Sequence, residues 1–335
     1  MKSVLDWTYC QYANRDPFFP EGWGDPELMR YLLKRGPSVA ANRKVSAIKV
    51  ELDSGRQDKA PEHSEGKYRQ TQGHFMSPYQ FSWKRKETLP EFARTARFLL
   101  LEPPTKTHKL AIHFAATGDE GYSRRRRIAA PLLKHGISQL ILENPYYGSR
   151  RNPEQARAVM PTVLSLLQMS RAAQDEGIAL ARYFRNRGYS DIMFTGISMG
   201  GYVAAAAGRE INFPVKVCSL VPSHSAAPVY TEGALMTACD WETLRKTNPL
   251  PEEHPLMVMR RLYSISDMHL HKARRKSFRA AIIGARKDAY IPEYSVEIVH
   301  RSLPGASLEW IRTGHVGAFI LGAGLYRRKI LELMQ

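Results

Sequence analysis

Three residues that together can activate a hydroxyl group are spread over the second half of the chain: Ser198, Asp288 and His315. Ser198 is the centre of Gly196-Ile-Ser-Met-Gly200, which matches the pattern G-x-S-x-G. In that pattern a sharp turn between a strand and a helix exposes the serine hydroxyl. A free hydroxyl is a poor nucleophile at neutral pH, so we expect His315 to remove its proton and Asp288 to orient the imidazole. The predicted chemistry is nucleophilic attack on a carbonyl carbon.

Other residues could supply the base or the acid, and their settings favour His315 and Asp288. His315 follows a predicted strand and lies between Gly314 and Gly317. Asp288 follows an apolar strand predicted at residues 278–283. The competing residues are His113, His224, His269 and His271 as bases and Asp267 as the acid. Of these, His113 is expected at the end of a strand, and His269 and His271 lie in a predicted insertion.

Two backbone N–H groups are expected to stabilise the oxyanion that forms during the attack. Met199 follows the serine at the start of a predicted helix, where unpaired N–H groups and the helix dipole favour negative charge. The second donor is expected in the loop after the strand 110–114, from Ala116, Thr117 or Gly118. We favour Thr117.

Strand-like and helix-like stretches alternate along the chain and would position these residues. The predicted strands cover 45–52, 79–83, 96–101, 110–114, 139–142, 192–194, 215–221, 278–283 and 308–312, and the predicted helices include 122–135, 162–186, 293–302 and 315–334. This alternation indicates a mostly parallel sheet flanked by helices. Ser198, Asp288 and His315 each follow a predicted strand, and their order along the chain is that of α/β-hydrolases. We therefore predict an α/β-hydrolase fold.

The pattern also divides the chain into parts. Residues 1–44 are predicted to form an N-terminal helical segment, and residues 45–222 and 277–335 the α/β-hydrolase core, with a polar loop at 53–66. Residues 223–276 contain several prolines and short helical pieces, and would form a helical lid inserted before the strand that precedes Asp288. Apolar residues of this insertion could wall an acyl-chain pocket or pack the lid onto the core: Met236, Leu256, Met257, Met259 and Leu262.

The chain is strongly basic. Its 335 residues include 49 lysines and arginines against 32 acidic residues, a net charge of +17, with dense clusters at 124–127, 272–276 and 327–329. Such charge suits nucleic acid, an anionic membrane surface or an anionic substrate. Because zinc-finger spacing, RNP-like sequence and basic–aromatic interleaving are absent from the sequence, nucleic-acid binding is not expected.

The apolar stretches and the cysteines indicate in which cellular compartment the protein is expected and whether it crosses a membrane. The longest apolar runs are too short to cross a bilayer, and the first residues lack the apolar core of a signal peptide. The three cysteines, Cys10, Cys218 and Cys239, show no metal-ligand spacing and are expected to be reduced thiols. We expect a cytoplasmic protein without a transmembrane segment, with peripheral contact to an anionic membrane as an alternative.

Several short motifs together resemble the α/β-hydrolase domain-containing protein 18 family. They are Gly22-Trp-Gly24, Ala116-Thr-Gly-Asp119 with the arginines after it, Glu143-Asn-Pro-Tyr-Tyr-Gly148 and Thr195-Gly-Ile-Ser-Met-Gly-Gly201. The resemblance covers most of the chain from about residue 18 and implies a hydrolase triad that maps onto Ser198, Asp288 and His315. It also implies lipid acyl esters, such as those of anionic phospholipids, as substrates. Ala116 stands where the family pattern has a glycine, which could narrow the pocket.

These observations predict a serine hydrolase that cleaves a carboxylic ester through an acyl-enzyme, with a small-molecule or lipid ester as substrate. Arg125, in the run of arginines, would attract an anionic head group, and Tyr146 and Tyr147 would line the pocket. The reaction requires no metal or organic cofactor. The alternatives are thioester or amide cleavage by the same triad, and a non-catalytic protein that binds lipid or a protein partner.

Overall fold

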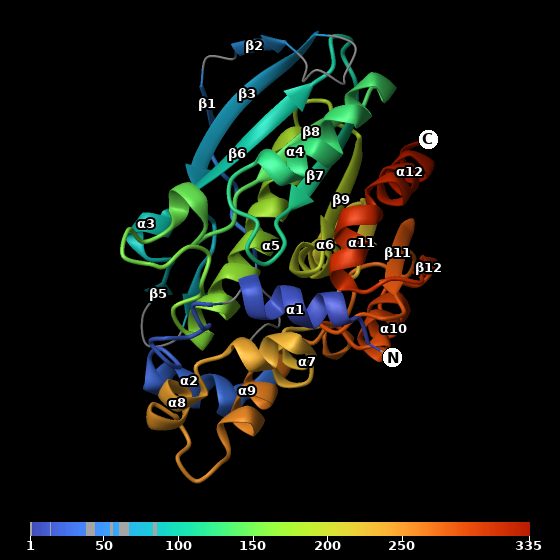
Figure 1. The fold of residues 1–335 in the computed structure, drawn as a ribbon. Coiled ribbons are helices and arrows are strands. Elements are labelled where there is room, and N and C mark those ends of the chain that lie inside the picture. The colour runs from blue at the N-terminus through green and yellow to red at the C-terminus, as the bar shows by residue number, and fades with distance from the viewer. Residues whose placement is uncertain (1, 14, 38–43, 54–55, 60–66, 83–85) are drawn as a thin grey trace.

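The computed structural model describes residues 2–13, 15–37, 44–53, 56–59, 67–82 and 86–335 (Figure 1). Their centre is a ten-stranded sheet with the order β1-β3-β6-β8-β7-β9-β10-β11-β12, and β2 pairs with β3 at one end. The strands are β1 (Glu51–Leu52), β2 (Arg56–Lys59), β3 (Lys67–Met76), β6 (Thr95–Glu102), β7 (Lys109–Phe114), β8 (Ser138–Leu142), β9 (Asp191–Ile197), β10 (Lys216–Leu220), β11 (Ala280–Ala285) and β12 (Ser307–Ile311). The strands from β8 to β12 along this order run parallel, and β6 runs antiparallel to both neighbours. A separate hairpin pairs β4 (Phe81–Ser82) with β5 (Lys86–Glu87).

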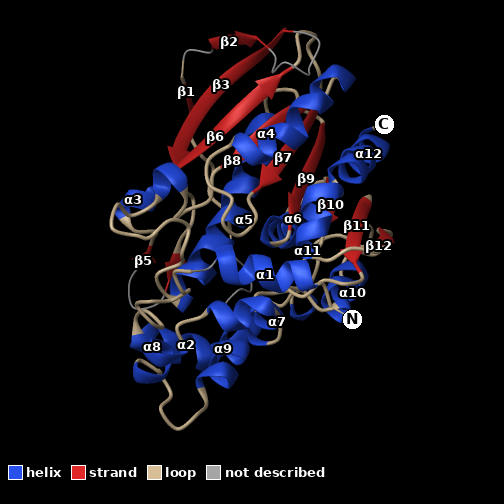
Figure 2. Ribbon diagram, viewed as in Figure 1, coloured by secondary structure: helices blue, strands red, loops and turns tan. Residues whose placement is uncertain are grey.

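Helices cover both faces of the sheet (Figure 2). One face carries α5 (Val163–Arg185), α6 (Met199–Glu210) and α10 (Glu293–Arg301), and the other carries α4 (Ser123–Ala129), the 3-10 helix η2 (Ala130–His135) and α12 (Ala323–Met334). Successive strand residues point to opposite faces, so Phe194 packs in the larger core cluster while Met193 packs in the second one. Because both faces of the sheet are covered, the central parallel strands are rich in apolar residues, and β11 is apolar throughout. The predicted α/β-hydrolase architecture is confirmed.

A layer of short helices lies at the carboxyl ends of the parallel strands, near the bottom of Figure 1. It combines two N-terminal helices with the segment between β10 and β11. The elements are α1 (Val4–Ala13), α2 (Pro26–Arg35), α7 (Ala227–Thr231), η4 (Ala234–Ala238), α8 (Trp241–Lys246), α9 (Pro255–Tyr263), η5 (Ser264–Ser266) and η6 (Met268–Leu270). The buried Trp23 indole donates to the Leu244 carbonyl at 2.7 Å, and the Phe18 N–H donates to the Ala238 carbonyl at 2.7 Å. The aromatic residues after α1 therefore fasten the N-terminal segment to the insertion.

Some predicted elements differ from those observed. Of the strand expected at 45–52, only Glu51–Leu52 pairs, with β3. The ten-residue strand β3 was not predicted because its sequence, KYRQTQGHFM, is mostly polar. The predicted polar loop at 53–66 contains β2, and its residues 54–55 and 60–66 lie outside the described residues, as does the last residue of the strand predicted at 79–83. The single helix expected at 315–334 is two, α11 (His315–Leu321) and α12, which meet at Gly322.

The remaining elements are short: α3 (Glu91–Arg94) and the 3-10 helix η3 (Gly148–Arg150). In the described part of the chain, every helix is too short or too polar to cross a bilayer. The three cysteines are buried and form no disulfide among the described residues.

Candidate active site

A strained turn between β9 and α6 carries Ser198. Its backbone has φ 56° and ψ −121°, a left-handed conformation that non-glycine residues rarely adopt. A Cβ on Gly196 would lie 2.3 Å from the carbonyl carbon of Gly200, and a Cβ on Gly200 would lie 2.4 Å from the Phe114 oxygen. Both positions therefore require glycine, because the helix begins so close to β7 and to the preceding strand. This geometry is the one that the G-x-S-x-G pattern predicts.

The structure brings Ser198, His315 and Asp288 into one hydrogen-bonded chain. The His315 Nε2 lies 3.0 Å from the Ser198 Oγ, and its Nδ1 lies 2.7 Å from the Asp288 Oδ2. The other oxygen of the buried Asp288 carboxylate accepts the Tyr290 and Ile291 N–H groups, each at 2.8 Å. A carboxylate at Nδ1 favours the tautomer in which Nε2 accepts the serine proton.

The electrostatic surroundings of His315 favour its charged form. Burial alone would lower its pKa, but the Asp288 carboxylate acts against burial through its charge and its hydrogen bond. The charge of Asp6 acts in the same direction, and together they raise the pKa of His315 above its ordinary value of 6.5. These surroundings therefore stabilise a protonated imidazole at this position.

Asp6 is a part of the site that sequence reasoning missed. Its fully buried carboxylate accepts the N–H groups of Ala289 at 2.9 Å, His315 at 2.8 Å and Val316 at 3.0 Å. It thereby joins the loop that carries the acid to the helix that begins with the base. The only signal in the sequence is an acidic residue in an otherwise apolar stretch, Val4-Leu-Asp-Trp7, which says nothing about its partners.

The two residues expected to form the oxyanion hole lie beside the serine. Thr117 and Met199 line the same cavity as Ser198, and the Thr117 Oγ1 is 3.9 Å from the Met199 sulfur. Within the loop, the Gly118 N–H donates to the Tyr147 hydroxyl at 3.2 Å. The Gly118 N–H is therefore already hydrogen-bonded within the protein. The N–H groups of Ala116 and Thr117 remain candidates for the second oxyanion donor.

Arg125 does not have the position expected of a substrate-binding residue. It is 5% exposed, its Nε lies 2.9 Å from the Asp119 Oδ2, and its guanidinium also donates to the Leu142 and Gly121 carbonyls. The structure does not bring Arg125 to the cavity at Ser198, because α4 turns this side chain inward. Arg125 instead fastens the segment after β7 to the end of β8.

Tyr146 and Tyr147 are also structural rather than pocket-lining residues. Both are at most 2% exposed, and neither is among the residues around the cavity at Ser198. The Tyr146 hydroxyl donates to the Gln168 side chain at 2.8 Å, while Tyr147 accepts the Gly118 N–H. Burial raises the pKa of both phenols, so their hydroxyls stay protonated. Their role is to order the loops around Ser198.

The cavity that reaches Ser198 has a volume of about 150 Å³ and is mostly apolar. Its apolar lining comes from α2, α5 and the insertion, through Leu28, Leu32, Leu164, Leu167, Tyr230, Tyr263 and Met268. Two roles were open for the insertion residues Met236, Leu256, Met257, Met259 and Leu262, an acyl-chain wall or packing onto the core, and none of them is among the lining residues. Instead, Met259 and Leu262 pack in the core. At one side the cavity reaches the cationic residues Arg171, Arg209 and Lys272.

The competing candidates have other partners. The His113 Nε2 lies 2.7 Å from the Gln139 side-chain oxygen, and burial lowers the pKa of His113 to about 4. The His271 Nε2 lies 2.8 Å from the Ile265 carbonyl. His224, Asp267 and His269 gather in a separate cluster.

Solved structures with the same fold are distant in sequence. The acetyl xylan esterase from Paenibacillus sp. R4 superposes with a TM-score of 0.56 at 12% identity, over 97% of this chain and 98% of that one. Acetyl xylan esterase 1 from Thermoanaerobacterium sp. JW/SL YS485 gives 0.56 at 16% identity, with the same coverage. Carboxyl esterase 2 from Tuber melanosporum gives 0.50 at 14% identity over the whole of both chains. These likenesses establish the fold.

A family model establishes a closer relationship. The model described as alpha/beta hydrolase domain containing 18 matches residues 16–254 and 246–335, which is nearly the whole chain. That match includes the turn at Ser198, the loop after β7 and the segments that carry Asp288 and His315. The protein is an α/β-hydrolase and belongs to the alpha/beta hydrolase domain containing 18 family.

Proposed function

We propose that the protein hydrolyses carboxylic esters through an acyl-enzyme formed on Ser198. The observation that carries this proposal is the chain of contacts from the Ser198 Oγ through both nitrogens of His315 to Asp288. Ser198 attacks the ester carbonyl while His315 takes the hydroxyl proton. His315 then protonates the departing alcohol, and a water molecule, activated by the same imidazole, releases the acid.

The oxyanion of both tetrahedral intermediates is held by the N–H groups of Met199 and Thr117. Met199 is the first residue of α6, where its N–H is free of an intrahelical partner and lies at the positive end of the helix dipole. Thr117 lines the same cavity, and its Oγ1 lies 3.9 Å from the Met199 sulfur. Donors fixed in advance cost no reorganisation when the charge develops.

The substrate in this proposal is a lipid acyl ester. The apolar cavity next to Ser198 accepts the acyl chain, and the helical insertion at 223–276, which contributes Tyr230, Tyr263 and Met268 to its lining, acts as the lid. Arg209 and Lys272 at the edge of the cavity favour an anionic head group, such as that of a phospholipid.

Peripheral contact with an anionic membrane belongs to the same proposal. Helices α1 and α11 pack against each other and expose apolar side chains: Val4, Leu5, Tyr9, Tyr12, Ile320 and Leu321. Apolar and aromatic side chains of this kind insert at a lipid interface, and a net charge of +17 attracts anionic lipid. His315 begins α11, so this surface adjoins the active site.

Covalent labelling tests the catalytic part. We expect a fluorophosphonate probe to label the wild-type chain but neither Ser198→Ala nor His315→Ala, with all three folded by circular dichroism. Esters of increasing acyl length, then thioesters and amides, identify the preferred bond. A folded wild-type chain that is not labelled would favour a binding protein over an enzyme.

Sedimentation with vesicles tests the lipid part. We expect binding to vesicles containing anionic phospholipid and weaker binding to neutral ones, with a loss in the variant Leu5→Asp/Ile320→Asp. Equal sedimentation of this variant and the wild type would contradict the membrane contact while leaving the labelling result intact.

A further inference from the structure

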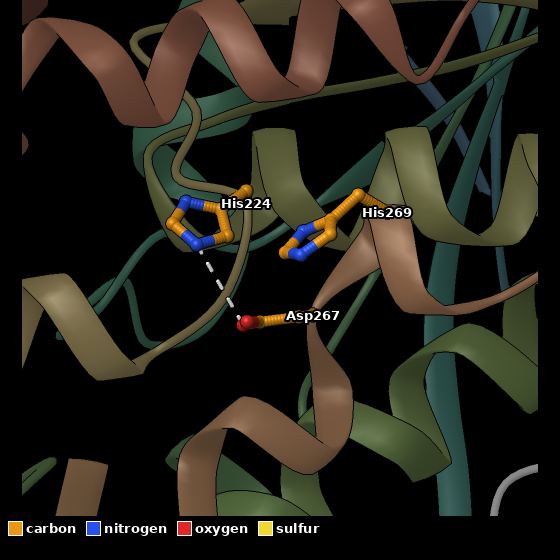
Figure 3. A group of neighbouring side chains, drawn as sticks. All are labelled: His224, Asp267 and His269. Carbon is orange, nitrogen blue, oxygen red and sulfur yellow. Dashed lines mark ion pairs between the residues drawn. The ribbon is translucent and has the colours of Figure 1, made fainter. Parts of the chain in front are cut away.

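Three side chains with metal-binding atoms meet where the end of the insertion touches the core. His224 follows β10, and Asp267 and His269 lie between η5 and the end of η6. Their ligand atoms all lie within 4.8 Å of one another. Figure 3 shows the His224 ring facing the Asp267 carboxylate, with the His269 ring beside them. Two segments that are distant in sequence thus supply one cluster.

The cluster is incomplete as a purely protein arrangement. Asp267 is 7% exposed, and its Oδ1 has no hydrogen-bond partner within the described residues. The His224 Nε2 lies 3.7 Å from this oxygen, which is too long for a hydrogen bond. A buried carboxylate oxygen without a partner is unfavourable, because burial removes its water without replacing it. A cation between the two residues would satisfy both atoms.

The other atoms of His224 already have the partners that a metal ligand needs. Its Nδ1 lies 2.8 Å from the Ser295 Oγ, and the same oxygen accepts the His224 N–H at 3.0 Å. When Nδ1–H donates to Ser295, the lone pair of Nε2 points toward Asp267. An outer hydrogen bond of this kind fixes the tautomer and orientation of metal-bound histidines. The Met268 N–H also donates to the His224 carbonyl at 3.2 Å, which holds the two segments together.

We propose that His224, Asp267 and His269 bind a divalent transition-metal ion, with zinc as the expected ion. Two imidazoles and one carboxylate suit zinc and its neighbours, whereas calcium and magnesium prefer oxygen ligands alone. His269 is exposed, so water can occupy the fourth position from its side. The guanidinium of Arg209 donates to the Met268 and His271 carbonyls and so anchors the segment that carries His269.

Such a metal would act on the shape of the catalytic cavity rather than in the reaction. Ser223 precedes the first ligand, and Ser266 and Met268 flank the second, and all three line the cavity at Ser198. A metal that joins His224 to Asp267 and His269 would therefore hold one wall of the cavity in place. The metal site itself does not depend on the proposed esterase activity.

Zinc binding by the full-length chain tests the proposal. The chain is stripped with a chelator, equilibrated with micromolar zinc and separated from free metal, and bound zinc and the melting temperature are measured. We expect one bound zinc per chain and a higher melting temperature. His269→Ala, a change at an exposed residue, should weaken zinc binding by at least about tenfold, and Asp267→Asn should do the same.

His135→Ala serves as the matched control, because His135 is an exposed histidine at the end of η2, away from the cluster. It should bind zinc as the wild type does. Substitution by cobalt should give the visible absorption of a nitrogen- and oxygen-ligated ion, and His269→Ala should abolish it. A wild-type chain that retains no zinc, or a His269→Ala chain that binds zinc as tightly as the wild type, would overturn the proposal. If Asp267→Asn fails to fold, His269→Ala alone decides.

Discussion

The carboxylate of Asp6 accepts a hydrogen bond from the backbone N–H of His315, 309 residues further along the chain. The same carboxylate holds the N–H groups of Val316 and Ala289, so it fixes both the base and the loop of the acid. Gly314 allows this approach, because a Cβ there would lie 2.6 Å from the Asp6 Oδ1. Asp6 is thus a positioning residue that acts on the reaction through His315.

Replacing Asp6 by Asn should lower kcat/KM by about ten- to hundredfold, mainly through kcat, because a small displacement of the base disturbs proton transfer. Loss of its charge should also lower the pKa of His315, so the acid limb of the pH–rate profile moves to lower pH. Steady-state kinetics across pH measures both. Asp16→Asn is the control, since Asp16 is partly exposed and pairs with Arg157. An unchanged pH profile in a folded Asp6→Asn chain would contradict the positioning role.

As the solution is acidified, the rate of hydrolysis should begin to fall at a pH above the usual pKa of histidine. The pKa of His315 is raised, and its protonated form cannot accept the serine proton, so kcat/KM should drop about tenfold per pH unit below that pKa. The effect of pH on stability has the opposite sign. The raised pKa of His315 stabilises the fold at pH values below 6.5, the pKa in the unfolded chain, and this contribution disappears as the pH rises through the pKa in the folded chain. Asp288→Asn should lower kcat by a factor of about 10³–10⁴. An acid limb centred below 6.5 would show that another group limits the rate.

Gly200→Ala should remove activity and lower stability by at least about 1–3 kcal/mol, because the added carbon would overlap the Phe114 carbonyl oxygen at 2.4 Å. Fluorophosphonate labelling and thermal unfolding measure the two effects. In Gly324→Ala the added carbon meets nothing within 4 Å, so this variant should label and melt like the wild type. Normal labelling of Gly200→Ala would mean that β7 and α6 separate more easily than the structure suggests.

Tyr147→Phe should reduce kcat/KM by up to about tenfold, the equivalent of one hydrogen bond. The change leaves the Gly118 N–H without its acceptor and loosens the loop that carries Thr117. Tyr146→Phe removes a comparable buried hydroxyl that donates to Gln168, and should have the smaller effect on kcat. Equal effects on kcat would argue against Thr117 as an oxyanion donor.

Arg125→Met should destabilise the protein by about 3–5 kcal/mol, because it leaves the buried Asp119 carboxylate without its partner. Adding Asp119→Leu to the Arg125→Met variant should recover part of the lost free energy of unfolding. The ratio of activity on anionic and neutral esters should stay unchanged in any folded variant. Arg124→Ala, at an exposed residue of the same run, should leave the free energy of unfolding within about 0.5 kcal/mol of the wild type. If a folded Arg125→Met chain changed its preference between anionic and neutral esters, the result would support the predicted contact between Arg125 and the substrate.

The parts of the site that the sequence could predict are those with local causes. The turn around Ser198 follows from two glycines and the serine between them, and the strand and helix beside it are visible in the pattern. Asp288 and His315 could be found because each follows a strand of a parallel sheet, where side chains converge. The fold was predictable for the same reason, since its central strands are short apolar runs.

The parts that could not be predicted depend on partners far away in sequence. Asp6 is a single acidic residue in a helix, and its positioning role comes from a hydrogen bond with the N–H group of His315, which is distant in sequence. Arg125 belongs to a run of four arginines, and only packing decides which of them turns inward to meet Asp119. The strand β3 has a polar sequence, so its pairing with β6 over residues 69–76 left no apolar signal.

The separation between Asp6 and His315 has a consequence for synthesis. The turn around Ser198 depends on β7, β9, β10 and α6, which are all complete once residue 220 has left the ribosome. The base of the proposed triad arrives only about a hundred residues later, and it must then find a carboxylate that was made 309 residues before it. A nascent or prematurely terminated chain can thus hold a formed turn with an inert serine. The proposed hydrolytic activity is acquired in a last step, when α11 docks onto α1.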